Sequence, residues 1–349
     1  WARIKTPDGA GEDAAGADVL YMRGDTVYDV SVLRALKGLD KVALVSAEGV
    51  PLAVKGRKDD HKAIEPFLSG GGKDALQGYA VKTPDDIVDP YNEMLRKRED
   101  PFCAVATDEN KRDIEWRLYM GSYKGVTDIV TKYLWPVPAF YVSRWCAGLK
   151  ISPNMVTSVG AILMLLAMYL FWQGQYGLGM LAGWIMTFLD TVDGKLARCT
   201  ITSSKWGNVF DHGIDLIHPP FWYMAWVFGL SAYGTPLPDG LSSVVIIAGF
   251  VFYIAGRLCE GYFIQRHGFH IHVWRRIDSF FRLVLARRNP NMIILTISLL
   301  IGRPDLGVVA ITLYAAFTFF VHILQSVQAD ISKARSPDKR ITSWLQVAG

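Results

Sequence analysis

The sequence predicts an α-helical integral membrane protein with six transmembrane helices and an interfacial juxtamembrane helix, preceded by an N-terminal soluble α/β domain. The chain has 349 residues, of which 51% are hydrophobic, and its mean hydropathy of +0.19 is high for a soluble protein. Long apolar runs dominate after about residue 150, whereas residues 1 to about 125 are mixed and charged. We therefore expect an α/β domain over 1–110, a linker and amphipathic helix over 111–150, and a transmembrane domain over 151–349.

Six apolar segments reach or approach the length of about 20 residues that a helix needs to cross a bilayer. The fifth is the shortest, and an Arg303-Pro304 turn separates it from the sixth. The predicted spans are 155–173, 178–198, 207–231, 241–264, 289–303 and 305–327.

The links between these spans predict their orientation, because Lys and Arg concentrate on the cytoplasmic side. The link between the fourth and fifth spans holds six arginines, whereas the links 173–177 and 231–240 hold neither Lys nor Arg. Both termini are thus expected in the cytoplasm. Ahead of the first span, the segment 127–150 mixes aromatic with basic residues, which favours a helix in the membrane interface over a simple linker.

The net charge of +4 is modest, and anionic lipid headgroups or phosphorylated substrates account for the basic residues. We expect no nucleic acid partner. The four cysteines form no C-x2-C pair and are interpreted as free thiols.

Four aspartates in the second and third spans carry the main functional signal. Asp190 and Asp193 are three residues apart, and Asp211 and Asp215 are four apart, so each pair lies on one face of a helix. Ionised carboxylates in apolar surroundings are costly, and a hard divalent cation with oxygen ligands compensates them. We therefore predict a Mg²⁺ or Mn²⁺ site. The alternative is two amphipathic helices whose acids face water.

The string D-x2-D-G-x2-A-R-x8-G-x3-D-x3-D resembles the signature of the CDP-alcohol phosphotransferases, a family of integral membrane enzymes. Its fixed positions are Asp190, Asp193, Gly194, Ala197, Arg198, Gly207, Asp211 and Asp215. The resemblance implies transfer of a phospho-alcohol group from a CDP-alcohol to an alcohol acceptor with release of CMP, in phospholipid or phospho-polyol biosynthesis. Asp190, Asp193 and Asp211 would hold the metal. Asp215 would act as general base or as a further metal ligand.

The same resemblance implies residues that bind the donor nucleotide. These are Gly194, Ala197, Arg198 and Gly207 of the signature, with Asn154 and Thr157 of an upstream element that resembles the family's P-N-x-[IV]-T. The small residues could instead serve tight helix packing, and Arg198 could be a cytoplasmic anchor.

Arginines are candidates for binding an acceptor phosphate, because a guanidinium can clamp phosphate oxygens. The candidates are Arg144, Arg257, Arg287 and Arg288. Contact with lipid headgroups is the alternative. The histidines, among them His212, His218 and His272, lack the ligand spacing of a zinc site and are interpreted as loop or interfacial residues.

The N-terminal residues 17–56 contain apolar clusters separated by an apparent helix, which predicts an α/β unit. A strand followed by Arg23-Gly24-Asp25 resembles sugar-phosphate nucleotidyltransferases, although their Gly-rich nucleotide loop is not present in this sequence. The arrangement resembles bifunctional inositol-phosphate cytidylyltransferase and CDP-inositol phosphotransferase enzymes. We expect a partial or degenerate nucleotidyltransferase-like domain, regulatory or dimerising, with catalysis there as the alternative.

The resemblance also implies the partners of the protein: a CDP-alcohol donor, an alcohol or lipid acceptor, membrane lipids, and a second copy in a homodimer. We expect a bacterial or archaeal inner or plasma membrane, and the loop charges predict that the active site lies on the cytoplasmic side. The competing interpretation is a cation or metabolite transporter, because intramembrane acids also line ion pathways.

Overall fold

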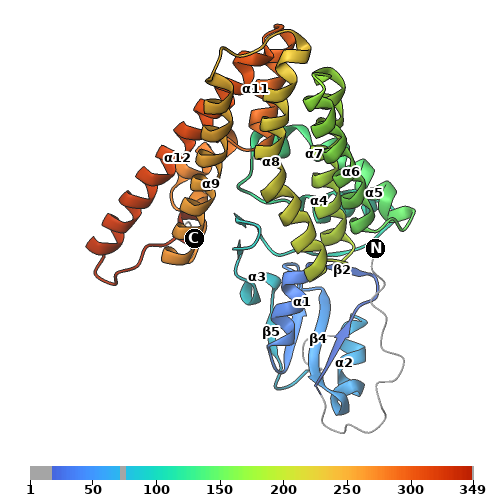
Figure 1. Ribbon diagram of the computed structural model, residues 1–349. Coiled ribbons are helices and arrows are strands. Elements are labelled where there is room, and N and C mark those ends of the chain that lie inside the picture. The colour runs from blue at the N-terminus through green and yellow to red at the C-terminus, as the bar shows by residue number, and fades with distance from the viewer. Residues whose placement is uncertain (1–17, 71–75, 348–349) are drawn as a thin grey trace. The chain divides into compact units, whose positions relative to one another are not determined.

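The computed structural model describes residues 18–70 and 76–347. The chain divides into two compact units, Ala2–Tyr123 and Lys124–Gly349 (Figure 1). Within the described residues, every β-strand lies in the first unit, and the second unit is helical. Each unit has its own hydrophobic core.

A four-stranded sheet forms the centre of the first unit. Its strands are β1 (Asp18–Met22), β3 (Val42–Val45), β4 (Pro51–Arg57) and β5 (Ala80–Lys82), in the spatial order β1-β4-β3-β5. Strand β4 is antiparallel to β1 and β3, whereas β3 and β5 are parallel. The mixed sheet confirms the predicted α/β unit.

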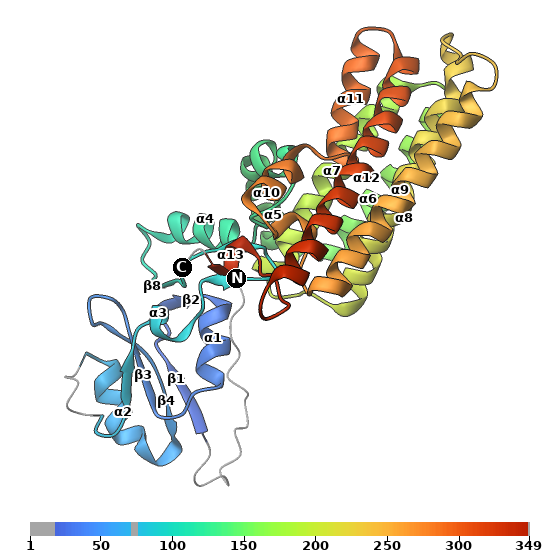
Figure 2. The same ribbon diagram turned by 90° about the vertical axis from the view of Figure 1, so that its left-hand side faces the viewer.

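Two helices cover opposite faces of this sheet, α1 (Val30–Lys37) and α2 (His61–Leu68) (Figure 2). Successive side chains of a strand point to opposite faces. Leu44 of β3 therefore joins the cluster of α1, whereas its neighbour Val45 joins the cluster of α2.

Short elements complete the first unit. Strand β2 (Thr26–Tyr28) pairs with β8 (Cys103–Val105), and β6 (Tyr91–Asn92) pairs with β7 (Lys97–Arg98). The remaining elements are η1 (Lys58–Asp60), α3 (Pro84–Ile87) and α4 (Lys111–Gly121).

Helices occupy all six ranges that were predicted as spans. They are α6 (Pro153–Trp172), α7 (Tyr176–Cys199), α8 (Lys205–Tyr233), α9 (Leu241–His267), α11 (Arg288–Leu300) and α12 (Pro304–Arg335). Helix α6 packs against α7 and α8, and α12 packs against α9 and α11 (Figure 2). Shorter elements lie around them: η3 (Val130–Leu134), α5 (Pro136–Gly148), η4 (Ile271–Val273), α10 (Arg276–Val284) and α13 (Trp344–Val347).

Three helices in the described part of the chain are long and apolar enough to cross a membrane, namely α6, α9 and α12. Helices α7 and α8 are less apolar because they carry the aspartates and several basic residues. Helix α11 has 13 residues, about 20 Å at 1.5 Å per residue, which is shorter than a bilayer core of roughly 30 Å. The coarse expectation of an apolar helical domain holds, whereas the count of six spans remains a prediction.

An aromatic core joins α6, α7 and α8. Phe171, Tyr176 and Trp226 are fully buried there, and Tyr176 donates a hydrogen bond to the Trp226 carbonyl at 2.6 Å. The backbones of α6 and α8 approach so closely that a Cβ on Gly229 would lie 1.9 Å from the Phe171 carbonyl oxygen. This packing fixes the helices on which the aspartates lie.

Helix α5 confirms the helix predicted before the first span. Val137, Tyr141 and Trp145 are exposed and recur every fourth residue, so they form one apolar stripe. Just before α5, Trp135 contacts Phe188 of α7 edge-on, with ring centroids 5.2 Å apart. The helix is therefore held against α7, and its location in a membrane interface remains a prediction.

Candidate active site

The connection between α7 and α8 brings the four aspartates to one end of the helical unit. Helix α7 ends at Cys199 and α8 begins at Lys205. Ser204 caps α8, because its hydroxyl accepts a hydrogen bond from the Gly207 amide at 3.0 Å. Since the connection is short, the C-terminal half of α7 and the N-terminal half of α8 lie at the same level.

Three of the four predicted metal ligands converge. Carboxylate oxygens of Asp190, Asp211 and Asp215 all lie within 4.8 Å of one another. Asp190 belongs to α7 and the other two belong to α8. Three carboxylates at this spacing form an all-oxygen donor set, which suits Mg²⁺ or Mn²⁺.

Arg288, at the first turn of α11, contacts this cluster. Its Nη1 donates to Asp215 and its Nη2 to Asp190, and its side chain is 13% exposed. The sequence suggested Arg288 as a ligand for an acceptor phosphate. That role stays a prediction; in the structure, Arg288 partly neutralises two of the converging carboxylates.

Asp193 is placed differently from the other three aspartates. Its side chain is buried, and its Oδ2 accepts a hydrogen bond from Thr157 of α6 at 2.5 Å. Its Oδ1 is buried without a hydrogen-bond partner among the described residues. Asp193 therefore links α7 to α6 and presents one unsatisfied oxygen beside the cluster.

The other signature residues lie near the same helix ends. A Cβ on Gly207 would be 2.9 Å from Asn154 Oδ1 and 3.0 Å from Ser204 Oγ, so a side chain at this position would displace Asn154. A Cβ on Gly194 would be 3.2 Å from a guanidinium nitrogen of Arg198. Ala197 is half-buried one residue before Arg198.

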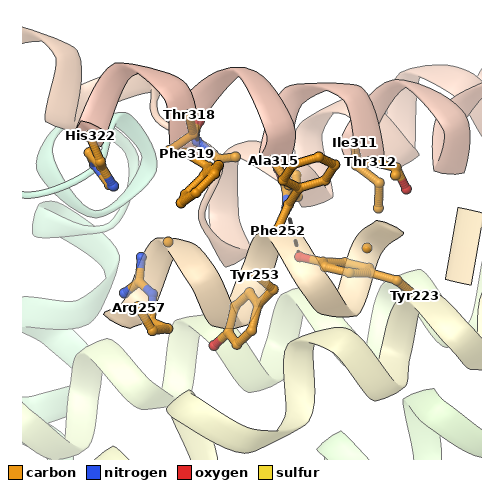
Figure 3. Close-up of a pocket in the computed structure, with 14 residues that line it drawn as sticks. Tyr223, Phe252, Tyr253, Arg257, Ile311, Thr312, Ala315, Thr318, Phe319 and His322 are labelled. Carbon is orange, nitrogen blue, oxygen red and sulfur yellow. Dashed lines mark hydrogen bonds between the residues drawn. The ribbon is translucent and has the colours of Figure 1, made fainter. Parts of the chain in front are cut away.

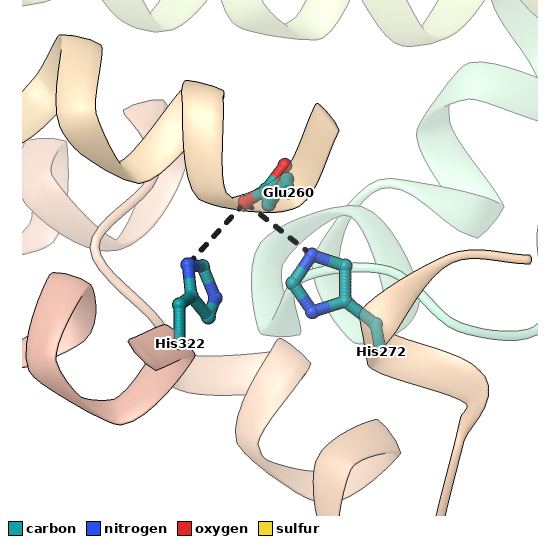
Figure 4. Close-up of side chains that lie close together, drawn as sticks. All are labelled: Glu260, His272 and His322. Atoms are coloured by element: carbon teal, nitrogen blue, oxygen red, sulfur yellow. Dashed lines mark ion pairs between the residues drawn. The ribbon is translucent and has the colours of Figure 1, made fainter. Parts of the chain in front are cut away.

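A second cluster contains Glu260 of α9, His272 of η4 and His322 of α12 (Figure 4). His272 Nε2 lies 3.6 Å and His322 Nδ1 lies 3.8 Å from Glu260 Oε1. Both imidazoles are buried, and neither ring nitrogen of His322 has a hydrogen-bond partner among the described residues. The sequence did not predict this cluster.

Two arginines determine the charge of the second cluster. Arg257 donates to Glu260 Oε1 at 2.6 Å, and Arg287 donates to Oε1 at 2.6 Å and to Oε2 at 2.7 Å. Arg287 also donates to His272 Nε2 at 3.1 Å. Two guanidinium groups exceed the charge of one carboxylate, so the cluster is positive and favours an anion over a metal ion.

A small pocket, partly open to its surroundings, adjoins this cluster. Figure 3 shows Arg257 and His322 at one end and the rings of Phe252 and Phe319 along its side. Asn291, three residues after Arg288, also lines it, and its buried Oδ1 has no hydrogen-bond partner among the described residues. The pocket thus combines a cationic end with polar and aromatic walls.

A buried network fixes the segment that carries Arg287 and Arg288. Asn289 donates to Asp128 Oδ1 at 3.0 Å and to Thr131 Oγ1 at 3.1 Å. Burial acts to raise the pKa of Asp128, but the Arg282 charge and hydrogen bonds from Thr131 and Asn289 outweigh it, so the pKa lies below its ordinary value. Ionised Asp128 therefore holds η3 against the start of α11.

Other predicted residues lie apart from these clusters. Arg144 is exposed on α5. His212 is exposed beside Asp211, and His218 Nδ1 contacts the Ile214 carbonyl. In the first unit, Arg23 forms a bidentate pair with Asp25, with contacts of 3.0 and 2.6 Å. Its hydrogen bond lowers the pKa of Asp25, so this carboxylate already has a cationic partner.

Comparison with known proteins agrees with the signature. The family model described as CDP-alcohol phosphatidyltransferase matches residues 150–321. Archaetidylinositol phosphate synthase of Pyrococcus horikoshii is 39% identical over 79 residues, 22% of this chain and 42% of the relative. Cholinephosphotransferase 1 of Xenopus laevis is 28% identical over 170 residues, 45% of this chain and 39% of the relative. Its counterpart in Gallus gallus is 40% identical over 85 residues, 24% of each chain.

The similarity to the CDP-alcohol phosphatidyltransferase family therefore lies in residues 150–321, within the helical unit. The matches span less than half the length of these curated relatives. The range that the family model matches does not include the α/β unit.

Proposed function

We propose that the protein transfers a phospho-alcohol group from a CDP-alcohol to an alcohol acceptor and releases CMP. The observation that carries this proposal is the convergence of Asp190, Asp211 and Asp215 within the family signature. A bound Mg²⁺ or Mn²⁺ would neutralise the donor pyrophosphate and the negative charge on the leaving CMP.

The aspartates have distinct roles in this proposal. Asp190 and Asp211 would hold the metal, and Asp193 would supply a further oxygen, oriented by its hydrogen bond from Thr157. Asp215 accepts the proton from the attacking hydroxyl. Arg288 contacts both Asp190 and Asp215. Asp215 could also serve as a fourth ligand, which its amide variant tests below.

The donor nucleotide is proposed to lie at the ends of α6, α7 and α8. Asn154 and Arg198 lie directly against Gly207 and Gly194, where a Cβ would be 2.9 and 3.2 Å from their side chains, and the guanidinium can bind a phosphate oxygen. Ala197 and Thr157 lie on the same helix ends. A larger side chain at Gly207 would displace Asn154 and obstruct this part of the site.

We propose that the acceptor phosphate binds at Arg257 and Arg287, beside the adjoining pocket. Each guanidinium has five N–H donors, and the pairs with Glu260 use only part of them. The name of the Pyrococcus relative, archaetidylinositol phosphate synthase, makes inositol phosphate the first acceptor to test. A lipid-linked CDP-alcohol is the corresponding donor. Such a reaction belongs to phospholipid or phospho-polyol biosynthesis.

The proposed setting is a membrane. Helices α6, α9 and α12 suit a bilayer, and we propose that α7, α8 and α11 complete six spans with both termini and the active site on the cytoplasmic side. The apolar stripe of α5 would lie in the interface. We also propose a homodimer, which light scattering of the detergent-solubilised protein would test.

The experiment is a measurement of CMP release by the protein in lipid nanodiscs, with a panel of CDP-alcohols and with inositol phosphate or glycerol phosphate as acceptors. Removal of divalent ions should abolish release, and Mg²⁺ or Mn²⁺ should restore it. Full activity after thorough metal removal would refute the proposed chemistry. Ion flux through proteoliposomes without CMP release would instead favour a transporter.

A further inference from the structure

The segment Ser343–Val347, which contains α13, lies against the connection between α9 and α10. The Ser343 side chain is fully buried, and its hydroxyl donates to the Val273 carbonyl at 2.6 Å. The Trp344 amide donates to the Trp274 carbonyl at 3.1 Å. Leu345 is also buried. We call this segment the C-terminal strap.

The strap connects to the second charged cluster through hydrogen bonds. Trp344 Nε1 donates to Ser279 Oγ at 2.9 Å, and Ser279 in turn donates to the His272 carbonyl at 2.7 Å. The imidazole of His272 faces Glu260 and accepts a hydrogen bond from Arg287. The strap is thus two hydrogen bonds away from a residue that lines the proposed phosphate site.

The connection that the strap contacts has little regular structure of its own. It begins at Gly268, whose φ of 82° lies in the left-handed region, and its one regular element is the three-residue turn η4. A single 3₁₀ turn has few internal hydrogen bonds, so contacts from outside determine its position. After η4 in the chain, Asp278 of α10 accepts hydrogen bonds from Arg275 and from Gln325 of α12. The strap supplies the contacts at Val273 and Trp274.

We propose that the C-terminal strap positions His272, and through it Arg287, for binding the acceptor phosphate. The inference rests on the proposed function, since it assigns a role in that same acceptor site. Trp344 is a positioning residue: its indole fixes Ser279, Ser279 fixes the His272 backbone, and His272 fixes the guanidinium that faces the phosphate. Loss of the strap contacts therefore weakens acceptor binding and leaves the aspartate site intact.

The test compares Trp344→Ala and Trp344→Phe with the control Val347→Ala, whose side chain is exposed, in the full-length protein in nanodiscs. Trp344→Phe keeps an aromatic ring beside Arg276 but removes the N–H donor. We expect Trp344→Ala to raise the KM for inositol phosphate about tenfold, the equivalent of one or two hydrogen bonds. Trp344→Phe should give a smaller rise. The kcat and the affinity for CMP with Mg²⁺ should stay within about twofold of wild type.

Two further measurements keep the inference separate from the proposed function. Hydrogen exchange of residues 269–276 should accelerate in Trp344→Ala, and the affinity for inorganic phosphate should fall in parallel with that for inositol phosphate. Unchanged phosphate affinity in Trp344→Ala, or an equal loss of CMP and phosphate affinity, would overturn the inference. A wild-type protein that binds phosphate but releases no CMP would overturn the proposed function alone, and the phosphate measurements would still decide the role of the strap.

Discussion

Two charged clusters in the helical unit are alike in geometry and opposite in charge. In the aspartate cluster and in the Glu260–His272–His322 cluster, three ligand atoms lie within 4.8 Å of one another. In the aspartate cluster, one arginine forms ion pairs with two of the three carboxylates. In the second cluster, two arginines form ion pairs with one carboxylate.

The difference shows that closeness of ligand atoms does not by itself identify a metal site. A divalent cation gains from surplus negative charge, which only the aspartate cluster has. At the second cluster, the cation would compete with two guanidinium groups for the same carboxylate oxygens. The surplus positive charge there suits a phosphate. One cluster thus fits the metal and the other fits the anionic acceptor.

The largest expected effect is on kcat and concerns the aspartate cluster. It distinguishes the general base from the metal ligands. Asp215→Asn should reduce kcat about 1000-fold, as loss of a general base does, and leave the affinity for CMP with Mg²⁺ nearly unchanged. Asp211→Asn should weaken both. Turnover measurements with calorimetry of CMP binding distinguish the variants. Equal loss of CMP affinity in both would make Asp215 a metal ligand and leave the base unassigned.

The next effect tests whether the second cluster binds an anion. Arg257→Ala should raise the KM for inositol phosphate about 30-fold, because it removes a charged hydrogen-bond donor from the phosphate. The matched control is Arg266→Ala, whose guanidinium pairs with Asp330 at the surface. Steady-state kinetics at saturating donor give the comparison. If both variants behave alike, the acceptor phosphate does not lie at Arg257.

Local sequence patterns account for the aspartate cluster better than for the second one. Helical spacing places Asp211 and Asp215 on one face of α8, and the short connection to α7 brings Asp190 to them. Asp193 was predicted from the same spacing, but it is not one of the three converging carboxylates: its Oδ2 accepts a hydrogen bond from Thr157 of α6, 36 residues earlier. Helix spacing cannot specify a contact that arises from the packing of a third helix.

The second cluster joins elements that no local pattern relates. Glu260, His272 and His322 come from α9, η4 and α12, and their meeting depends on how α9 packs against α12. One signal was nevertheless present in the sequence. Glu260 is the one acid in the largely apolar helix α9, and such residues are usually paired and functional. The segment following α12 gave no comparable signal, since its contacts are mainly with backbone carbonyl groups.

A smaller effect is expected on Mn²⁺ affinity, which one variant in each cluster compares directly. Asp190→Asn should weaken Mn²⁺ binding more than about tenfold, since even the loss of an outer partner of a ligand has an effect of this size. His322→Ala should leave the affinity unchanged, because its cluster is positive. Electron paramagnetic resonance of free Mn²⁺ provides the titration. If His322→Ala bound one Mn²⁺ fewer than the wild type, the second cluster would be a metal site.

The smallest expected effect concerns the α/β unit, because both clusters lie entirely within Lys124–Gly349. A shortened chain that begins at Lys111 keeps α4, η3 and α5 together with every residue of the two clusters. Its kcat for CMP release and its KM for inositol phosphate should stay within about twofold of the full-length values. Thermal unfolding in nanodiscs would control for loss of folding. A folded shortened chain with normal Mn²⁺ affinity but a raised KM would show that the α/β unit contributes to the acceptor site. That result would contradict the proposal that the second cluster alone binds the acceptor.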